Sequence, residues 1–118
     1  MTQQCTGIII DDEPDQLEVM SEYFTMRGFN IIGSGANGCQ ADKLFKEKHP
    51  DFVILDLNMP DYDGDYAIKK IKECDPQAKI FIVTGCSTCS FEESKVEAVF
   101  KKPVHMTELK DMICNSCM

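Results

Sequence analysis

The stretch FVILDLNMPDYDG, which spans residues 52–64, decides the fold of this chain. Its first four residues are all apolar, a pattern typical of a strand that is buried on both faces of a parallel sheet. Asp56 follows that strand directly, and Pro60 and Gly64 then introduce a turn. Ligands of parallel α/β sheets bind beyond the carboxyl ends of the strands, and an acid at such a place needs a partner or a chemical role. Asp56 is therefore the first candidate functional residue.

The rest of the sequence repeats this pattern and predicts a doubly wound α/β fold. Only twelve residues, 86–97, separate the fourth apolar run from the fifth, which is close to the minimum for a crossover between parallel strands. We therefore expect a five-stranded parallel sheet with helices on both faces and a shortened fourth helix. Strands are predicted at residues 7–10, 29–33, 52–55, 79–84 and 98–100, and helices from Pro14 to a stop at Gly28, over 39–48, from just after Gly64 to about Cys74, and around 109–113. Methionines 20, 26, 106 and 112 are expected in or near the core.

The composition indicates one globular domain and argues against direct nucleic-acid or membrane binding. The chain has 118 residues, 43% of them hydrophobic, and its 12 basic and 20 acidic residues give a net charge of -8. Such a surface repels nucleic acid and anionic lipid. No apolar stretch reaches the roughly 18 residues of a membrane-spanning helix, and the first residues lack the features of a signal peptide. Residues 1–118 are therefore expected to form a single cytoplasmic domain with no output domain.

Seven cysteines in so short a chain leave several readings open. Cys86 and Cys89 form one C-x-x-C pair, and Cys114 and Cys117 form another. Two such pairs can supply four thiolates to a structural zinc ion. Without a secretion signal the default is reduced thiols, with the pair near the C-terminus prone to oxidation. The sequence alone does not choose between metal binding and disulfide formation at these pairs.

Polar side chains follow four of the predicted strands. Asp11 and Asp12 follow the first, Asp56 the third, Thr84 ends the fourth, and Lys102 follows the fifth. Parallel strands bring these residues to one edge of the sheet, where three carboxylates repel one another unless a cation neutralises them. Oxygen ligands without nearby His or Cys favour Mg²⁺. Asp56 could then attack phosphorus in line, while Thr84 and Lys102 stabilise charge on the phosphoryl oxygens.

This set, together with Met59, Pro60, Gly64 and Pro103, resembles the receiver domain of bacterial and archaeal response regulators, in particular the single-domain chemotaxis type. The resemblance covers essentially the whole chain. It implies a flavodoxin-like fold with strand order 2-1-3-4-5.

The resemblance also implies roles for the strand-end residues. Asp56 would be phosphorylated by a histidine kinase or a histidine phosphotransfer protein. Asp12, Asp56 and the backbone carbonyl of Asn58 would bind Mg²⁺ directly, and Asp11 would bind it through water. Thr84 and Lys102 would contact the phosphoryl group, and the Lys102–Pro103 bond would be cis. The protein would act by docking to a protein target, with self-catalysed phosphotransfer and dephosphorylation in place of conventional enzyme turnover.

Two features depart from the family pattern. Val99 occupies the position, three residues before the lysine, where receivers usually carry an aromatic residue, and the alternation of a strand places Phe100 on the opposite face. The segment between Thr84 and Lys102 is also shorter than usual. In this family the residue two positions beyond the threonine, here Cys86, and the residue at the position of Asn58 influence how fast water reaches the acyl phosphate, so the resemblance implies that Cys86 could tune the lifetime of the phosphorylated state.

Three other functions share parts of this pattern. A phosphorelay intermediate would use the same residues and pass the phosphoryl group onward. A phosphorylation-independent interaction module would keep the fold without the chemistry. A phosphatase of the haloacid-dehalogenase type needs a second aspartate two positions after the nucleophile, and this chain has Asn58 there.

Overall fold

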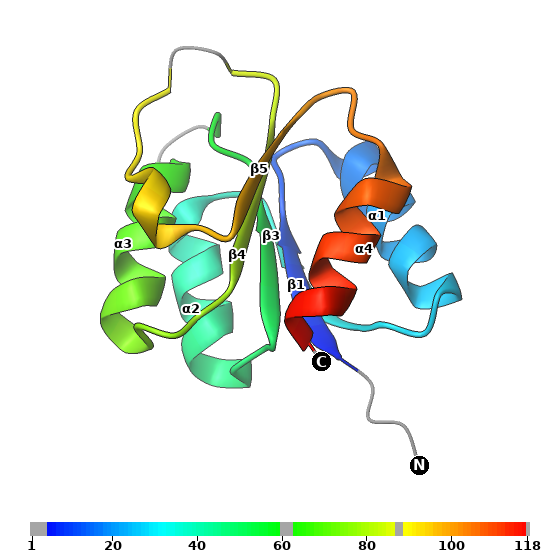
Figure 1. Cartoon of the computed structure of the whole chain (residues 1–118). Helices are drawn as coiled ribbons and strands as arrows, with labels where there is room; N and C mark the ends of the chain where they lie inside the picture. Colours follow the sequence, from blue (N-terminus) through cyan, green and yellow to red (C-terminus); the bar gives the residue numbers. More distant parts are fainter. Residues whose placement is uncertain (1–4, 60–62, 87–88, 118) are drawn as a thin grey trace.

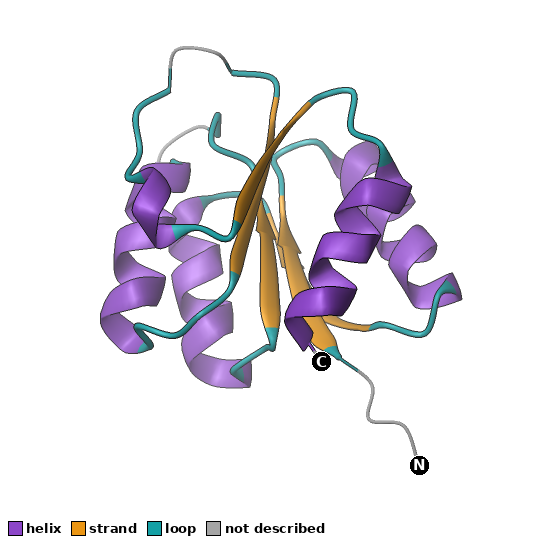
Figure 2. Ribbon diagram, in the orientation of Figure 1, coloured by secondary structure: helices purple, strands orange, loops and turns teal. Residues whose placement is uncertain are grey.

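The computed structural model describes residues 5–59, 63–86 and 89–117, and these form a sheet flanked by helices (Figures 1 and 2). The strands are β1 (Thr6–Ile10), β2 (Asn30–Gly35), β3 (Phe52–Leu55), β4 (Ile80–Thr84) and β5 (Ala98–Lys101). The helices are α1 (Pro14–Met26), α2 (Gly38–Lys48), α3 (Gly64–Cys74) and α4 (Met106–Cys117), and a 3₁₀ turn, η1, spans Glu93–Lys95.

The sheet has the strand order β2-β1-β3-β4-β5, and every neighbouring pair of strands is parallel. This confirms the predicted flavodoxin-like, doubly wound topology. Helices α2 and α3 cover one face of the sheet and α1 and α4 cover the other, as Figure 1 shows. The carboxyl ends of β4 and β5 point to the top of that view, whereas the start of β1 and the end of α4 lie at the bottom.

Alternating side chains of the strands divide the core into two layers. Ile8 and Ile10 of β1 pack with α2 and α3, whereas Ile9 between them packs with α1 and α4. On the second face Phe24, Phe29 and Phe52 meet edge-on or tilted, with ring centroids 5.4 to 6.2 Å apart. β1, β3 and β4 are buried on both faces because helices cover both, which is why their sequences read as uninterrupted apolar runs.

Local signals explain where the helices begin. Pro14 opens α1, where its missing N–H leaves no hydrogen bond unmade. The side chains of Asn37 and Asp63 cap α2 and α3 by accepting from the amides of Gln40 at 2.9 Å and Tyr66 at 3.0 Å. At Gly64 the backbones come so close that a Cβ would lie 2.6 Å from Leu57 Cα. A side chain there would push α3 away from the loop that follows β3.

The segment between β4 and β5 contains no α-helix among its described residues, 85–86 and 89–97. The shortened fourth helix that the sequence predicts is reduced to the three-residue turn η1. Edge strand β5 is left partly uncovered, and Val99 is 42% exposed. Phe100 packs into the core layer of α1 and α4, which confirms that the two side chains lie on opposite faces. Met20 is buried as predicted, but the expectation for Met26 and Met112 was wrong, since they are 80% and 40% exposed.

Four of the cysteines form two disulfides, one of which the sequence left open for its C-x-x-C pair and one of which it did not indicate. Cys5 forms a disulfide with Cys117, and Cys86 forms one with Cys89. Both the four-thiolate zinc site and the expectation of reduced thiols are therefore wrong for these residues. The reason is topological, because Cys117 ends α4 beside the start of β1, whereas Cys86 follows the carboxyl end of β4 at the opposite edge of the sheet. Cys114 has no disulfide partner and is exposed.

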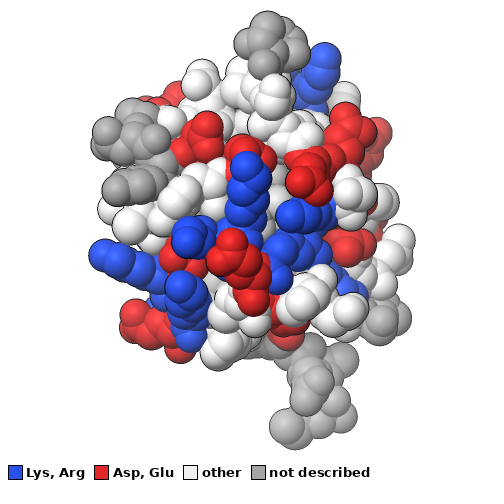
Figure 3. All heavy atoms as spheres, turned by 90° about the vertical axis from the view of Figure 1, so that its left-hand side faces the viewer, with Lys and Arg blue, Asp and Glu red and all other residues white. Residues whose placement is uncertain are grey.

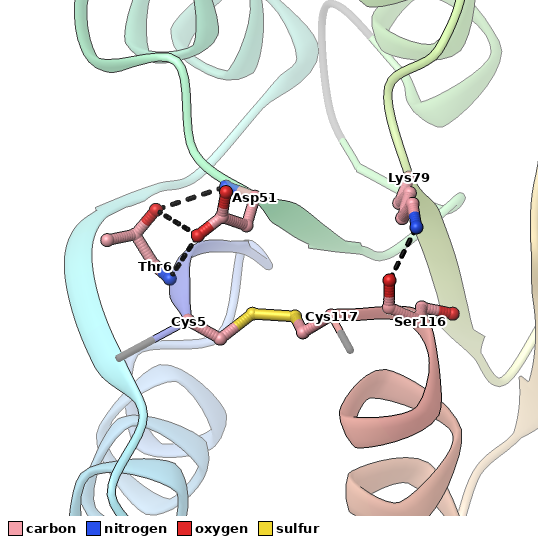
Figure 4. Close-up of a disulfide and its surroundings, with 6 residues drawn as sticks. All are labelled: Cys5, Thr6, Asp51, Lys79, Ser116 and Cys117. Atoms are coloured by element: carbon pink, nitrogen blue, oxygen red, sulfur yellow. Dashed lines mark hydrogen bonds between the residues drawn. A yellow bond between two sulfur atoms is a disulfide. The ribbon is translucent and has the colours of Figure 1, made fainter. Parts of the chain in front are cut away.

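Polar contacts surround the Cys5–Cys117 disulfide, as Figure 4 shows. The carboxylate of Asp51 accepts from the Thr6 amide at 2.8 Å and from the Thr6 hydroxyl at 3.1 Å. The ammonium of Lys79 donates to the carbonyl of Ser116 at 2.5 Å. The amino-terminal edge of the sheet and the end of α4 are thus held together by hydrogen bonds as well as by the disulfide.

The face formed by α2, α3 and η1 carries mixed charge. Figure 3 shows its Lys and Arg side chains gathered across the centre, with Asp and Glu between and around them. The pairs Lys69–Asp65, at 3.0 Å, and Lys95–Glu92, at 3.7 Å, lie on α3 and beside η1. In the part of the chain that the structure describes, no helix is long and apolar enough to cross a membrane.

Candidate functional site

The carboxyl edge of the sheet brings the predicted strand-end residues together. One carboxylate oxygen from each of Asp11, Asp12 and Asp56 lies within 4.8 Å of the others. Asp11, Asp56 and Thr84 are almost completely buried, with exposures of 3%, 5% and 2%. The hydrogen bonding between β1 and β3 continues as far as Asp56, whose amide donates to the Ile10 carbonyl at 2.9 Å. Parallel strands that end level with one another therefore create the cluster.

Lys102 bridges two of the acids. Its ammonium nitrogen lies 2.9 Å from Asp11 Oδ2 and 3.5 Å from Asp56 Oδ2. The lysine directly follows β5, and its amide donates to the Thr84 carbonyl of β4 at 2.9 Å. The following Lys102–Pro103 bond is cis, as the resemblance implied. A positive charge from the edge of the sheet thus reaches the acids at its centre.

The pKa of Asp56 is raised above its ordinary value of 3.8. Burial is the main cause, and the charge of Asp11 adds to it. The charge of Lys102, the Asn58 amide and a hydrogen bond with Thr84 act in the opposite direction. The Asn58 amide donates to Asp56 Oδ1 at 3.2 Å. The folded protein therefore disfavours the ionised form of Asp56, and a further cation beside it would reduce this electrostatic penalty.

The pKa of Lys102 is raised as well. Burial by itself would lower this pKa, but the hydrogen bond to Asp11 and the charges of Asp56 and Asp11 outweigh that effect. Lys102 is consequently a permanent cation at neutral pH, placed where negative charge is concentrated.

A pocket of about 180 Å³ opens above these residues. Asp12, Asp56, Asn58 and Lys102 line it, together with Glu13, Gly85 and Cys86. Thr84 is buried and does not line the pocket, but its hydroxyl oxygen accepts from the amide of the lining residue Cys86 at 3.0 Å. The sequence pointed to Asp12, Asp56, Asn58 and Lys102 at this pocket, whereas Glu13 and Gly85 were not singled out as lining residues. Their position directly after Asp12 and Thr84 was the available signal.

A larger pocket, of about 490 Å³, lies between α3 and η1. Its lining includes Lys69, Lys72, Glu73 and Lys95, and none of the strand-end residues. It marks the face left open by the reduced fourth helix and does not belong to the acidic cluster.

A doubly wound sheet of this order, with an acidic cluster, a buried threonine and a lysine at its strand ends, defines the receiver class of signalling domain. The sequence model of the response regulator receiver domain matches residues 8–114. The chain therefore belongs to the response regulator receiver-domain family of two-component signalling. Members of this family are signalling proteins and not conventional enzymes. Of the motif that carried the resemblance, Pro60 lies outside the described residues.

Two relatives are matched over most of their own length. The chain is 33% identical over 92 residues to the chemotaxis protein CheY of Bacillus subtilis, a match that covers 78% of this chain and 74% of that protein. It is 29% identical over 110 residues to the sporulation initiation phosphotransferase F of the same organism, covering 90% of this chain and 88% of that protein. A chain of the CheX-CheY-BeF3-Mg complex of Borrelia burgdorferi superposes with a TM-score of 0.85 at 24% identity, covering 97% of this chain and 90% of that one. That likeness is one of fold.

Proposed function

We propose that this chain is a stand-alone response regulator that accepts a phosphoryl group on Asp56 and signals by a change of shape to a protein partner. The donor would be a sensor histidine kinase or a histidine phosphotransfer protein. Residues 1–118 would act as one receiver domain in the cytoplasm, without a nucleic-acid or membrane contact of their own. The observation that carries the proposal is the Lys102 ammonium between the carboxylates of Asp11 and Asp56, at the rim of a pocket open to solvent.

The transfer step follows from the two oxygens of Asp56. One oxygen attacks phosphorus in line with the bond to the donor histidine, an O–P bond forms, and the N–P bond breaks with its electron pair returning to the imidazole. The Asn58 amide already holds Oδ1 at 3.2 Å, while Oδ2 faces Lys102 at 3.5 Å. Lys102 and the Thr84 hydroxyl would then stabilise charge on the equatorial oxygens of the phosphoryl group.

The donor set fits a magnesium ion. Its oxygens come from carboxylates within 4.8 Å of one another, and hard cations prefer such ligands. Asp12, Asp56 and the carbonyl of Asn58 would hold Mg²⁺ directly, and Asp11 would hold it through water. When bound, the ion would neutralise charge on the acids and on the incoming phosphoryl group. It would also oppose the burial that raises the pKa of Asp56, and so favour the ionised nucleophile.

The test is intact-mass measurement after incubation with acetyl phosphate and Mg²⁺. The unmodified chain is expected to gain one phosphoryl group, and Asp56→Asn should gain none. Thr84→Ser serves as the matched control, because it keeps the hydroxyl and should retain the adduct. An adduct that persists in Asp56→Asn would place phosphorylation elsewhere. A folded chain that never forms an adduct would leave the phosphorylation-independent interaction module as its function.

A second candidate is a phosphorelay intermediate. The likeness to sporulation initiation phosphotransferase F, which extends over 90% of this chain, favours it. An intermediate would pass its phosphoryl group to the histidine of a phosphotransfer protein. Mixing the purified phosphorylated chain with such proteins and following the phosphoryl group by intact mass separates the two functions. Transfer to the second protein supports the relay, whereas loss of the phosphoryl group only to water supports the stand-alone regulator.

A further inference from the structure

We propose that the Cys86–Cys89 disulfide is a redox site that dithiols reduce to two thiols. We further propose that its redox state sets how long Asp56 stays phosphorylated. The first part concerns the thiols alone, and the second rests on the proposed function. Nothing in the phosphoryl chemistry itself requires a cysteine pair.

One end of the disulfide, Cys86, lies at the pocket rim. Cys86 lines the same pocket as Asp56 and Lys102, and both Cys86 and Cys89 are half-buried, neither sealed in the core nor fully exposed. Their Cα atoms are 5.8 Å apart, an ordinary spacing for a disulfide. Because the pocket opens to solvent, a thiolate of a small dithiol or a redox protein can approach Cys86 from that side.

Stability accounts for this disulfide less than for the long one. The entropy that a cross-link removes from the unfolded chain grows with the length of the loop it closes. The Cys86–Cys89 separation is 3 residues, whereas Cys5 and Cys117 are separated by 112. The long disulfide is thus the stronger stabilising cross-link, and the short one acts locally, beside the pocket.

That segment is connected to the phosphoryl-contacting hydroxyl. The Cys86 amide donates to Thr84 Oγ1 at 3.0 Å, so the backbone of Cys86 fixes the direction of the Thr84 hydroxyl. Cys89 packs against the core layer beneath α3 with Phe91 and Val96. The disulfide therefore ties the residue that orients Thr84 to the packed interior. Opening it releases Cys86 from this anchor.

The redox step is ordinary thiol–disulfide exchange. One thiolate of the reductant attacks a sulfur of the pair, the S–S bond breaks, and a mixed disulfide forms with the departing cysteine leaving as thiolate. The second thiol of the reductant then displaces the other cysteine. Two electrons and two protons pass to Cys86 and Cys89, and the reductant leaves as a disulfide. The reverse exchange with an oxidised dithiol restores the bond.

Reduction is expected to shorten the phosphorylated state. Without its bond to Cys89, Cys86 holds the Thr84 hydroxyl less firmly and lets water approach the acyl phosphate. Loss of one hydrogen bond of ordinary strength corresponds to a rate factor of about five. We therefore expect dephosphorylation about fivefold faster in the reduced protein.

The experiment uses the Cys5→Ser/Cys117→Ser chain, in which Cys86–Cys89 is the disulfide under test and the long cross-link at the far edge of the sheet is absent from both redox states. The chain is phosphorylated with acetyl phosphate and Mg²⁺ and the donor is removed. Loss of the adduct is then followed by intact mass with and without dithiothreitol. Alkylation and peptide mapping report whether Cys86 and Cys89 became thiols. Cys86→Ser/Cys89→Ser, with the long disulfide intact, is the matched control and should decay at the faster rate whether or not reductant is present.

The outcomes are distinct. Faster decay on reduction in the first chain and no response in the control support the proposal. Equal decay in both redox states, with mapping that shows the thiols formed, overturns the regulatory part. If Cys86 and Cys89 remain unalkylated after treatment with dithiothreitol, the disulfide was not reduced, and the proposed redox site is overturned. Absence of any adduct in either state refutes the proposed function instead, and the alkylation result still reports on the thiols.

Discussion

Removal of the Cys5–Cys117 disulfide is expected to cost the protein a large part of its stability. The two cysteines are 112 residues apart, so the bond closes nearly the whole chain into a loop. In the chain-entropy treatment a loop of roughly 100 residues contributes about 4.7 kcal/mol. Domains of this size have a free energy of unfolding of about 5 to 15 kcal/mol, so the loss would be a third of it or more.

The native state should survive this change. Lys79 still donates to the Ser116 carbonyl, and Asp51 still bonds Thr6. The buried side chains of Leu109 and Ile113 keep α4 against the sheet. The effect therefore falls mainly on the unfolded chain, which becomes free to expand.

The assay is urea unfolding of Cys5→Ser/Cys117→Ser and of the unmodified chain, followed by circular dichroism. We expect the free energy of unfolding to fall by about 4 to 5 kcal/mol and the dependence on urea to steepen, because a freed chain exposes more surface. Cys86→Ser/Cys89→Ser is the matched control, and its short loop predicts a loss of only about 2 kcal/mol. Equal losses in the two variants, or a loss below about 1 kcal/mol from the long loop, would refute the reasoning.

Three further changes test the site and its surroundings. Because burial raises the pKa of Asp56 above 3.8, its ionised form destabilises the metal-free fold at neutral pH, so Asp56→Asn should unfold at higher urea in the presence of chelator. The difference in stability between Asp56→Asn and the wild type should shrink as pH falls through the raised pKa, because the folded wild type takes up a proton more readily than the unfolded chain. A difference in stability that grows on acidification would contradict this expectation. Mg²⁺ at about 100 times its dissociation constant should stabilise the wild type by about 2.7 kcal/mol in a thermal melt, and Asp12→Asn should show a much smaller gain at the same concentration. Gly64→Ala should lose about 2 kcal/mol or more by urea unfolding, since its Cβ would lie 2.6 Å from Leu57 Cα, whereas Gly85→Ala, with no atom within 4 Å of the new Cβ, should be neutral or slightly stabilising.

The positions of the secondary-structure elements could be predicted closely because their signals are local. The predicted strand at residues 52–55 coincides with β3, and the helix expected after Gly64 ends at Cys74 as predicted. Apolar runs, caps and breakers act over a few neighbouring residues, so they can be recognised without a partner in space. Strand order was implied by the family resemblance, since apolar runs alone do not order the strands of a sheet.

Side-chain environments were less predictable. Met20 and Met26 occur on the same helix, yet one is 2% and the other 80% exposed. The reduction of the fourth helix to η1 also exceeded what the length of the segment indicated. Exposure depends on where a helix meets its neighbours and where it extends past them, and no short stretch of sequence contains that information.

The sequence by itself determined the alternation of strands and helices and the chemical groups that follow each strand. Apolar periodicity and the polar residues after it are properties of consecutive positions, and parallel pairing then places Asp11, Asp56, Thr84 and Lys102 at one edge. Only the tertiary structure decided which groups touch. Lys102 bridges Asp11 and Asp56, and Cys117 bonds Cys5 and not a zinc ion, because these contacts join residues 46 to 112 positions apart, and folding alone sets their separation in space.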